Sequence, residues 1–478
     1  MRASLFLALA LAVNLAAQQT AHQQLEKLVD QHSAQYIEDS KKIWNYAELG
    51  YHEEKSSGLL QQELKAAGFT IQAGVANEPT GFIASFGQGK PIIGIMGEFD
   101  ALPGLSQASV PDRSPVVTGA PGHGCGHNLL GSGAALAAVA VAEYMEKNHV
   151  AGTLRYYGTP AEEGGSGKIY MLRAGLFKDV DVVLHWHPSN ANGIQNGGAL
   201  AVVSARFTFH GMAAHAALAP DRGRSALDAI MLMGNGIEFM REHVPSNARI
   251  HYIITNGGAA PNIVPDTATM ELMARSPTLP ALDLIWKRIL KIADGAALMT
   301  ETTLETKIQS SDANIIGNDP LAKLAQKNLE EVGGFRYTAE EMKFAEEIQK
   351  TLPEENRGNL DASSRVNALR PVDPNAPSAS TDAGDVSWNV PTIGFGAATF
   401  VPGVGAHTWQ GTACAGMSIG QRGMVVAAKA IALTAEDLFA DPKLVAAART
   451  DFDLRMKGKV WASQIPTDAK APLDYRAH

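Results

Sequence analysis

The chain changes its hydrophobic pattern part-way, and this change limits the folds that it can adopt. Between residues 81 and 187, apolar runs such as GFIASFG, PIIGIMG and VDVVLHWH alternate with helical segments, above all LLGSGAALAAVAVAEYMEK. Continuous apolar strands separated by helices are typical of a largely parallel sheet that helices cover on both faces. In VSARFTF, residues 203–209, apolar and polar residues alternate instead, which indicates a strand with one exposed face.

This alternating strand opens a unit whose predicted order is strand, helix, strand, strand, helix, strand. That order is the ferredoxin-like pattern. Its strands are VSARFTF, RIHYIIT, ATMELMAR and TTLETKI, and its helices are RSALDAIMLMGNGIEFM and ALDLIWKRILKIADGA. After it, the helix PLAKLAQKNLEEV, a long acidic loop with prolines, the strand PTIGFG and the helix SIGQRGMVVAAKAIALTAEDLF resume the first pattern. We therefore predict an α/β domain of residues 18–198 and 311–458 with a mixed, largely parallel sheet, an inserted α+β domain of residues 199–310, and a tail of residues 459–478.

The first residues, MRASLFLALALAVNLAAQQ, have the pattern of a secretory signal peptide. One arginine precedes an apolar run from Leu5 to Val13, and small residues precede a polar segment. We expect cleavage near Ala17 and a periplasmic or secreted protein. A short buried helix is the alternative, which the abrupt change from LAA to QQTAHQQ disfavours. We find no later apolar run long enough to span a bilayer, so we expect no membrane partner.

Composition narrows the class further. The 478 residues, 45% of them hydrophobic and 19% charged, are enough for more than one packed domain. The 40 basic and 49 acidic residues give a net charge of -9 without a basic cluster, which argues against nucleic-acid binding. The two cysteines, Cys125 and Cys414, are far apart in the sequence, and a chain of this size needs no disulfide, so we expect Cys125 to be free.

Side chains with metal-binding chemistry follow several strands of the α/β domain. The carboxyl ends of such strands are where open sheets bind ligands. The segments are GEFDALPG with Glu98 and Asp100, GHGCGHN with His123, Cys125 and His127, GTPAEEGGSG with Glu162 and Glu163, LHWHP with His185 and His187, and the late loop VGAHTWQ with His407. A thiolate with imidazoles suits zinc or another late divalent metal. Each segment alone has an explanation without a metal, but the five together favour a metal site.

Two of these segments leave roles open. Glu162 and Glu163 are adjacent, so one could ligate a metal while the other holds the proton of an activated water. His185 and His187 share one face of their strand, so periodicity does not decide which of them would ligate.

In their order and approximate spacing, GEFDALPG, GHGCGHN, PAEEGG, HWHP, GMAAHAA and AHTWQ resemble one family of co-catalytic, dinuclear metallopeptidases and amidohydrolases. It includes carboxypeptidase G, the auxin-conjugate amidohydrolases and the bacterial aminobenzoyl-glutamate hydrolases, and CGHN, STDAGDVSW and AHTWQ are most similar to the last group. The resemblance covers nearly the whole mature chain. It implies an α/β metallopeptidase catalytic domain and two divalent metal ions per subunit, Zn or Mn. The implied ligands are Cys125, His127, Glu163, His187 and His407.

The resemblance also implies how the site acts. Glu162 would be the general base in amide hydrolysis by a metal-activated water, and the inserted domain would serve as lid and dimerisation domain. His215 of GMAAHAA would steady the oxyanion, often from the partner subunit, and Asn262 and Arg275 would bind the substrate's carboxylate. For Arg275, a surface ion pair on the polar face of its strand is the alternative.

The substrate that this resemblance implies is an N-acyl or N-aroyl amino acid, similar to aminobenzoyl-glutamate, or a short peptide. The expected assembly is a homodimer or a complex with a related subunit. Auxin-conjugate hydrolases carry an aspartate where this chain has Asn128, so a charge that would orient His127 is absent at that position and their substrate preference transfers poorly.

Other functions fit the sequence less well. An exported dipeptidase or carboxypeptidase of the same family, and a binding protein that kept the fold without the chemistry, stay as alternatives. The segment GMSIG has the G-x-S-x-G pattern of serine hydrolases, but it lacks a preceding strand and a usable later histidine, so Ser418 is expected to cap a helix. Cys125 as a nucleophile with His127 as base is also conceivable. The glycines of the GHGCGHN segment lack the third small residue of a dinucleotide-binding loop.

Overall fold

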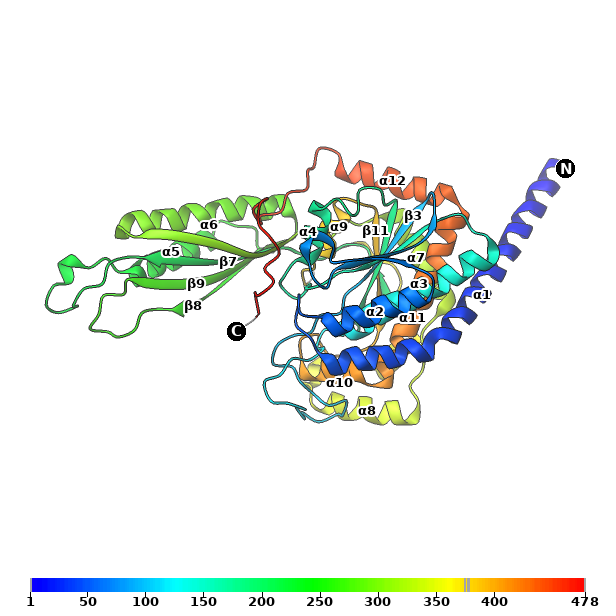
Figure 1. Cartoon of the computed structure of the whole chain (residues 1–478), viewed down its shortest axis with the longest axis horizontal. Helices are drawn as coiled ribbons and strands as arrows, with labels where there is room; N and C mark the ends of the chain where they lie inside the picture. The colour runs from blue at the N-terminus through cyan, green and yellow to red at the C-terminus, as the bar shows by residue number, and fades with distance from the viewer. Residues whose placement is uncertain (1, 374, 376–378, 477–478) are drawn as a thin grey trace.

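The computed structural model describes residues 2–373, 375 and 379–476, and for residues 2–17 only the backbone. The side chains of the predicted signal peptide, residues 1–17, therefore lie outside the described residues. Figure 1 shows an elongated molecule in which a smaller lobe projects from a larger one. The smaller lobe is built from the alternating segment that interrupts the α/β pattern.

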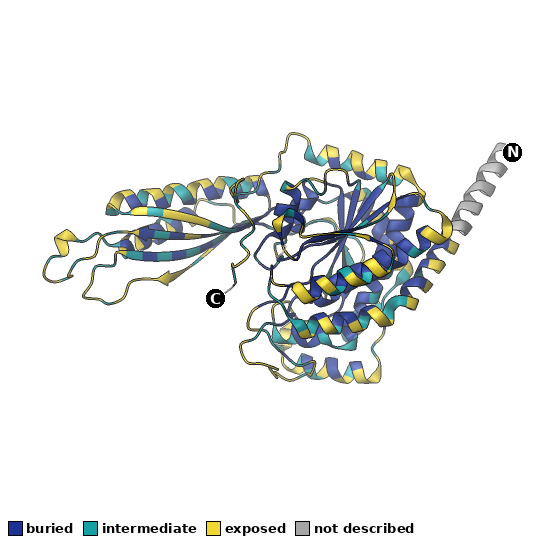
Figure 2. Cartoon of the chain, viewed as in Figure 1, coloured by how far each residue is buried: buried dark blue, intermediate teal, exposed yellow. Residues whose placement is uncertain are grey.

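The larger lobe is organised around a seven-stranded sheet of order β1-β2-β4-β3-β5-β11-β6. Its central strands β4, β3, β5 and β11 are mutually parallel, whereas β1, β2 and β6 pair antiparallel at the two edges. The strands are β1 (Thr70–Ala73), β2 (Phe82–Gln88), β3 (Ile92–Gly97), β4 (Gly152–Gly158), β5 (Val182–Ser189), β6 (Gly193–Gln195) and β11 (Thr392–Ala398). The central strands are buried (Figure 2), as their continuous apolar runs predict.

Helices cover both faces of this sheet, which confirms the predicted α/β architecture. On one face α1, α3 and α11 pack together over the main apolar core, and α4 and α9 contribute to the core on the other face. The helices of the larger lobe are α1 (Arg2–Tyr46), α2 (Glu54–Ala66), α3 (His127–Asn148), α4 (Gly167–Arg173), α7 (Asp319–Val332), α8 (Ala339–Lys350), α9 (Ala383–Ser387), α10 (Trp409–Gly416), α11 (Ser418–Ala440) and α12 (Pro442–Met456).

Helix α3 is the central helix of this lobe. Its alanine-rich sequence has high helix propensity and lets neighbouring elements approach closely on every side. Among the described residues it is the one helix long and apolar enough to cross a bilayer, but 94% of its most apolar window is buried inside the fold. It is therefore placed as a core helix.

The smaller lobe is a four-stranded antiparallel sheet of order β10-β7-β9-β8. Its strands are β7 (Ala201–His210), β8 (Arg249–Asn256), β9 (Thr267–Ser276) and β10 (Thr303–Asp312), and its helices are α5 (Ala226–Arg241) and α6 (Leu279–Thr300). The helices pack on the face formed by Val203, Ala205, Phe207 and Phe209, the face that the alternation predicts to be buried. The element order is the predicted ferredoxin-like one, whereas the exact domain boundaries stay a prediction.

The C-terminal part differs from the prediction in two respects. The helix expected to be the last, α11, is followed by α12, and Ser418 does not cap α11, because Met417 occupies the N-cap and Ser418 Oγ donates to Glu341 Oε1 at 2.8 Å. The described residues of the predicted proline-bearing loop form the short 3-10 turns η3 (Glu354–Asn356) and η4 (Leu360–Ser364) and an isolated β-bridge from Val366 to Asn192. Two further 3-10 turns are η1 (Val75–Asn77) and η2 (Pro220–Arg222). After α12 the chain runs back between the two lobes (Figure 1, red).

Candidate active site

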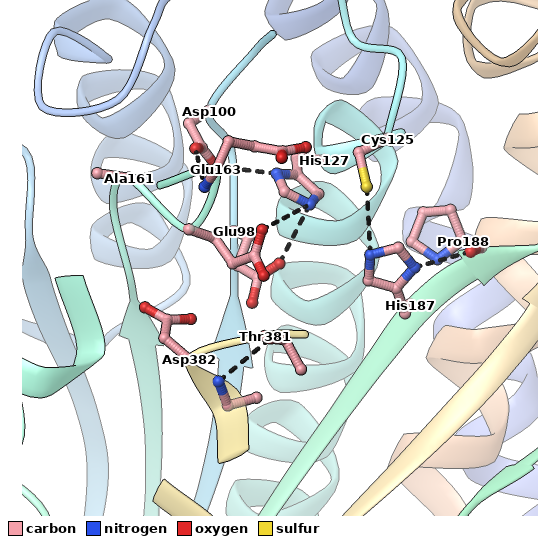
Figure 3. Close-up of polar contacts among 12 residues, drawn as sticks. Glu98, Asp100, Cys125, His127, Ala161, Glu163, His187, Pro188, Thr381 and Asp382 are labelled. Atoms are coloured by element: carbon pink, nitrogen blue, oxygen red, sulfur yellow. Dashed lines mark hydrogen bonds and ion pairs between the residues drawn. The ribbon is translucent and has the colours of Figure 1, made fainter. Parts of the chain in front are cut away.

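His127 is the centre of a buried polar cluster at the carboxyl ends of β3, β4 and β5. It is the first residue of α3, and its Nδ1 donates to Asp100 Oδ1 at 2.8 Å. Asp100 follows β3, and its second oxygen accepts the backbone N–H of Glu163 at 2.9 Å. Among the described residues His127 Nε2 has no hydrogen-bond partner, and it lies 3.3 Å from Glu98 Oε2 and 4.0 Å from Glu162 Oε2. Figure 3 shows His127 between Asp100 and Glu98, with Cys125 and His187 beside it.

The backbone around the cluster is held in uncommon conformations. Gly126, the N-cap of α3, has φ 81°, and a Cβ there would lie 2.9 Å from Pro188 Cγ, so only glycine fits. Ala161 and His407 also have positive φ, 56° and 61°, which costs free energy for residues with a side chain. Such strain is concentrated at functional sites.

Cys125 and His187 form the second part of the cluster. The sulfur of Cys125 lies 3.4 Å from His187 Nε2, while His187 Nδ1 donates to the backbone oxygen of Pro188 at 2.8 Å. The Nε2 lone pair of His187 therefore faces the sulfur. Cys125 and Cys414 are both free, as expected for Cys125. Burial, and then the charge of Glu163, raise the pKa of the Cys125 thiol well above its usual range, so a cation that binds there would displace its proton.

Glu163 and His407 form the third part. Glu163 Oε2 lies 3.3 Å from His407 Nε2, and Glu163 Oε1 is buried without a hydrogen-bond partner in the described part of the chain. The His407 side chain is 56% exposed, so it closes the cluster on the solvent side.

The cluster fits a divalent cation. Ligand atoms lie within 4.8 Å of one another in three groups, namely Cys125 with His127 and His187, Cys125 with Glu163 and His407, and Glu98 with His127 and Glu162. The first two groups contain all five ligands that the resemblance implies, and they share Cys125. The buried atoms His127 Nε2, Glu163 Oε1 and Glu98 Oε2 have no hydrogen-bond partner within the residues that the structure describes. A cation that they coordinate would take the place of such partners. A thiol, imidazoles and carboxylates together suit a late divalent metal.

Glu162 lies beside the predicted ligands, and its carboxylate can accept a proton. Its side chain is only 9% exposed. Burial, and then the charges of Glu98 and Glu163, raise its pKa well above its usual range. A carboxylate with a raised pKa holds a proton more readily near neutral pH, which is what a general base needs.

Lys168 is a site residue that the sequence analysis missed. It lies in α4 just after the glutamate pair, is fully buried, and places Nζ 2.7 Å from Glu98 Oε1 and 2.5 Å from Asp382 Oδ1. Burial raises the pKa of Glu98, but the charges of Lys168 and then His127 lower it by more, so Glu98 stays ionised. A lysine within the glycine-rich segment GGSGKIY was the available signal.

His123 and His185 lie outside the ligand groups. His123 Nε2 donates to the backbone oxygen of Ile43 at 3.0 Å, and burial lowers the pKa of His123 to about 3 and that of His185 to about 4. Asn128 points away from His127, because its Nδ2 donates to the backbone oxygens of Ser40 and Ala415. The orienting charge for His127 therefore comes from Asp100.

The three predicted residues of the smaller lobe lie apart from this cluster. His215 Nδ1 accepts the N–H groups of Ala217 and Leu218, and Asn262 is exposed. In the described part of the chain neither contacts the ligand groups. Arg275 in β9 donates to Ser380 Oγ at 3.4 Å, at the junction of the two lobes. The ion pair considered for Arg275 is not seen in the described residues, because its neighbour Glu271 pairs with Arg206 at 2.6 Å.

The sequence model of peptidase family M20/M25/M40 matches residues 94–432, which contain every predicted metal ligand and Glu162. The chain belongs to this family. It is 41% identical over 444 residues to the B-type subunit of p-aminobenzoyl-glutamate hydrolase from Escherichia coli K12, covering 88% of this chain and 92% of that protein. It is 30% identical over 446 residues to human Xaa-Arg dipeptidase, covering 89% of this chain and 90% of the dipeptidase.

Solved structures agree with this assignment at the level of the fold. This M20-family chain matches an aminobenzoyl-glutamate utilization protein from Klebsiella pneumoniae with a TM-score of 0.61 and 18% identity, over 87% of this chain and 98% of that one. It matches a dinuclear metal-binding M20 peptidase from Bacillus subtilis with a TM-score of 0.59 and 17% identity, over 86% and 99%. The resemblance inferred from the motifs is confirmed. The protein is an amide-bond hydrolase with residue groups suited to a metal.

Proposed function

We propose that this M20-family hydrolase cleaves N-acyl or N-aroyl amino acids of the aminobenzoyl-glutamate type with two divalent metal ions, Zn or Mn. The observation that carries the proposal is the position of Glu162 beside two ligand groups that share Cys125. Cys125, His127, Glu163, His187 and His407 all belong to these two groups and would hold the ions. The relative that is 41% identical, a p-aminobenzoyl-glutamate hydrolase, supports an aroyl amino acid as the substrate.

In the proposed mechanism, Glu162 accepts a proton from the water that attacks the amide carbonyl and returns it to the leaving amine. The products are a carboxylic acid and an amino acid. When bound, the ions would acidify the water and polarise the carbonyl. Asp100 fixes the ring of His127 through Nδ1 and the Glu163 turn through its N–H, so both ligands are held before substrate arrives.

The smaller lobe would complete the site. His215 would steady the oxyanion from the lid of a second copy, and Asn262 and Arg275 would bind the substrate's carboxylate. This assignment makes the working form a homodimer or a complex with a related subunit. The relatives include proteins named for two different subunits of one hydrolase, which supports a related partner. The signal-peptide pattern supports a periplasmic site of action.

A second candidate is a dipeptidase, which the 30% identity to Xaa-Arg dipeptidase favours. One assay separates the two. Purified protein is loaded with Mn or Zn in parallel and given aminobenzoyl-glutamate, N-acetyl amino acids and dipeptides that include Xaa-Arg. We expect the highest kcat/KM on aminobenzoyl-glutamate. Preference for dipeptides would favour the dipeptidase, and metal-loaded protein that hydrolyses none of them would favour a binding protein.

A further inference from the structure

Residues 459–476, which we call the strap, lie outside the segment that matches the M20 family. The strap is attached at its start and middle by specific contacts. Trp461 Nε1 donates to Asp385 Oδ1 at 2.7 Å, and Gln464 N donates to Ser311 Oγ at 3.2 Å. Arg173 donates to the backbone oxygens of Ile465 and Pro466, and the buried Ile465 packs with residues of α4. The strap therefore crosses from the base of the smaller lobe onto the larger lobe (Figure 1).

The far part of the strap packs beneath the turn that carries the glutamate pair. The ring of Tyr475 meets that of Tyr51 edge-on, with centroids 5.9 Å apart, and Tyr51 Oη donates to the backbone oxygen of Gly165 at 2.8 Å. A Cβ at Gly50 would lie 2.4 Å from Tyr475 Oη, and one at Gly164 would lie 3.5 Å from the Tyr475 ring. The Tyr475 hydroxyl fits because residue 50 is glycine, whereas a Cβ at residue 164 would make an ordinary van der Waals contact with the ring.

Arg476 then joins two strand ends of the catalytic cluster. Its Nη2 donates to the backbone oxygen of Glu163, and its Nη1 lies 3.5 Å from the backbone oxygen of Ala101. Ala101 directly follows Asp100, which itself accepts the N–H of Glu163. The backbone of Glu163 is thus held on its N–H side by Asp100 and on its C=O side by Arg476.

The turn between β4 and α4 needs such support. Ala161 and Ser166 have φ 56° and 52°, so the turn stores conformational free energy at residues that disfavour this region. Between these two residues, the backbone bonds within the turn run from Gly164 N to Glu162 O and from Gly165 N to Ala161 O. Contacts with residues outside the turn, such as Asp100 and Arg476, therefore help to set the direction of the Glu162 and Glu163 side chains.

We infer that the strap is a clamp on the active site and that Arg476 is a positioning residue, which fixes the Glu162–Glu163 turn against the end of β3. The inference rests on the proposed function, in which these two glutamates ligate metal and move the proton. Arg476 touches neither substrate nor reacting atoms. It acts through the two backbone oxygens that it joins.

The first test needs no metal and no substrate. Hydrogen exchange is measured by mass spectrometry on the metal-free, full-length protein as wild type, Arg476→Ala and Asp474→Ala, the last an exposed position of the same strap. We expect amides of residues 159–166 to exchange about tenfold faster in Arg476→Ala, because charge-assisted hydrogen bonds are lost. Asp474→Ala should match the wild type. Equal exchange in all three proteins would overturn the clamp.

The second test separates positioning from folding. In metal-loaded protein, Arg476→Ala should lower kcat about tenfold with little change in KM, Arg476→Lys should recover part of it, and millimolar guanidinium should partly restore Arg476→Ala. Unchanged kcat in Arg476→Ala, or a higher kcat that would mark the strap as an inhibitor, would contradict the inference. A wild type that is inactive on every amide would instead defeat the proposed function and leave the exchange result standing.

Discussion

Asp100 contacts two parts of the candidate active site at once, the ring of His127 and the backbone of Glu163. The fully buried Nδ1 of His127 donates to Asp100 Oδ1 at 2.8 Å, while Asp100 Oδ2 accepts the N–H of Glu163 at 2.9 Å. Burial raises the pKa of Asp100, but His127, the N–H of Glu163 and the charge of Arg476 together lower it by more, so Asp100 is ionised. One carboxylate thereby sets the tautomer of one predicted ligand and the backbone of another.

Asp100→Asn should therefore weaken metal binding although Asp100 is not a ligand. Loss of such a partner typically costs 10- to 100-fold in metal affinity, so about this decrease is expected for Mn or Zn. Competition with a fluorescent chelator measures it, and the exposed Asp112→Asn serves as the matched control. Equal affinities in the two variants would show that Asp100 does not support the site.

Cys125 and His123 lie two residues apart but should behave differently. Cys125→Ser should lower metal content and activity together, since the two groups that contain the five predicted ligands both include this sulfur. His123→Asn should leave the metal in place, because His123 donates to the backbone of Ile43. Metal analysis of the dialysed proteins checks both. Full metal content in Cys125→Ser would remove Cys125 from the ligand set.

Lys168 should be essential for stability. Lys168→Met leaves Glu98 and Asp382 buried without their shared cation. Removing one partner of a buried pair typically costs about 3–5 kcal/mol, so a loss of about this size in the free energy of unfolding is expected in urea. Adding Asp382→Asn to Lys168→Met should recover part of the loss. A stable single variant would show that water reaches the pair.

The contacts of His22 should make the stability of the protein depend on pH. Burial lowers the pKa of His22, but Asp437 and then Glu331 raise it by more, so the net shift is upward. The contribution of His22 to the free energy of unfolding is complete below its unfolded-state pKa of about 6.5, and it is lost as the pH rises through its folded-state pKa. His22→Gln should therefore cost about 2 kcal/mol near pH 6 and clearly less near pH 9. Urea unfolding of both proteins at the two pH values measures this, and a pH-independent difference would contradict a charged His22.

Local pattern was enough to predict the layers and most of the cluster. Strand β3 is buried on both faces, which accounts for its continuous apolar run. The alternation from Val203 to Phe209 reflects burial of one face only. Residues such as Cys125, His127 and Glu163 could be found because parallel strands bring their carboxyl ends to one edge.

Contacts between distant segments could not be predicted in this way. Lys168 needs Asp382, which is 214 positions away, and Arg476 reaches Glu163 across 313 positions. The choice between His185 and His187 also depended on tertiary structure, because only His187 faces Cys125. His215 does not meet the cluster within the described residues of one chain, so its predicted role depends on a second copy.

In the proposed mechanism, Glu162 moves the proton during amide hydrolysis while the ligands hold the metal. The most direct measurement is kcat on aminobenzoyl-glutamate for wild type and Glu162→Gln, with metal content determined on the same samples. We expect unchanged metal content and a fall in kcat of at least about 10²-fold, the usual contribution of a positioned acid–base group. Full activity in Glu162→Gln with the metal bound would contradict it.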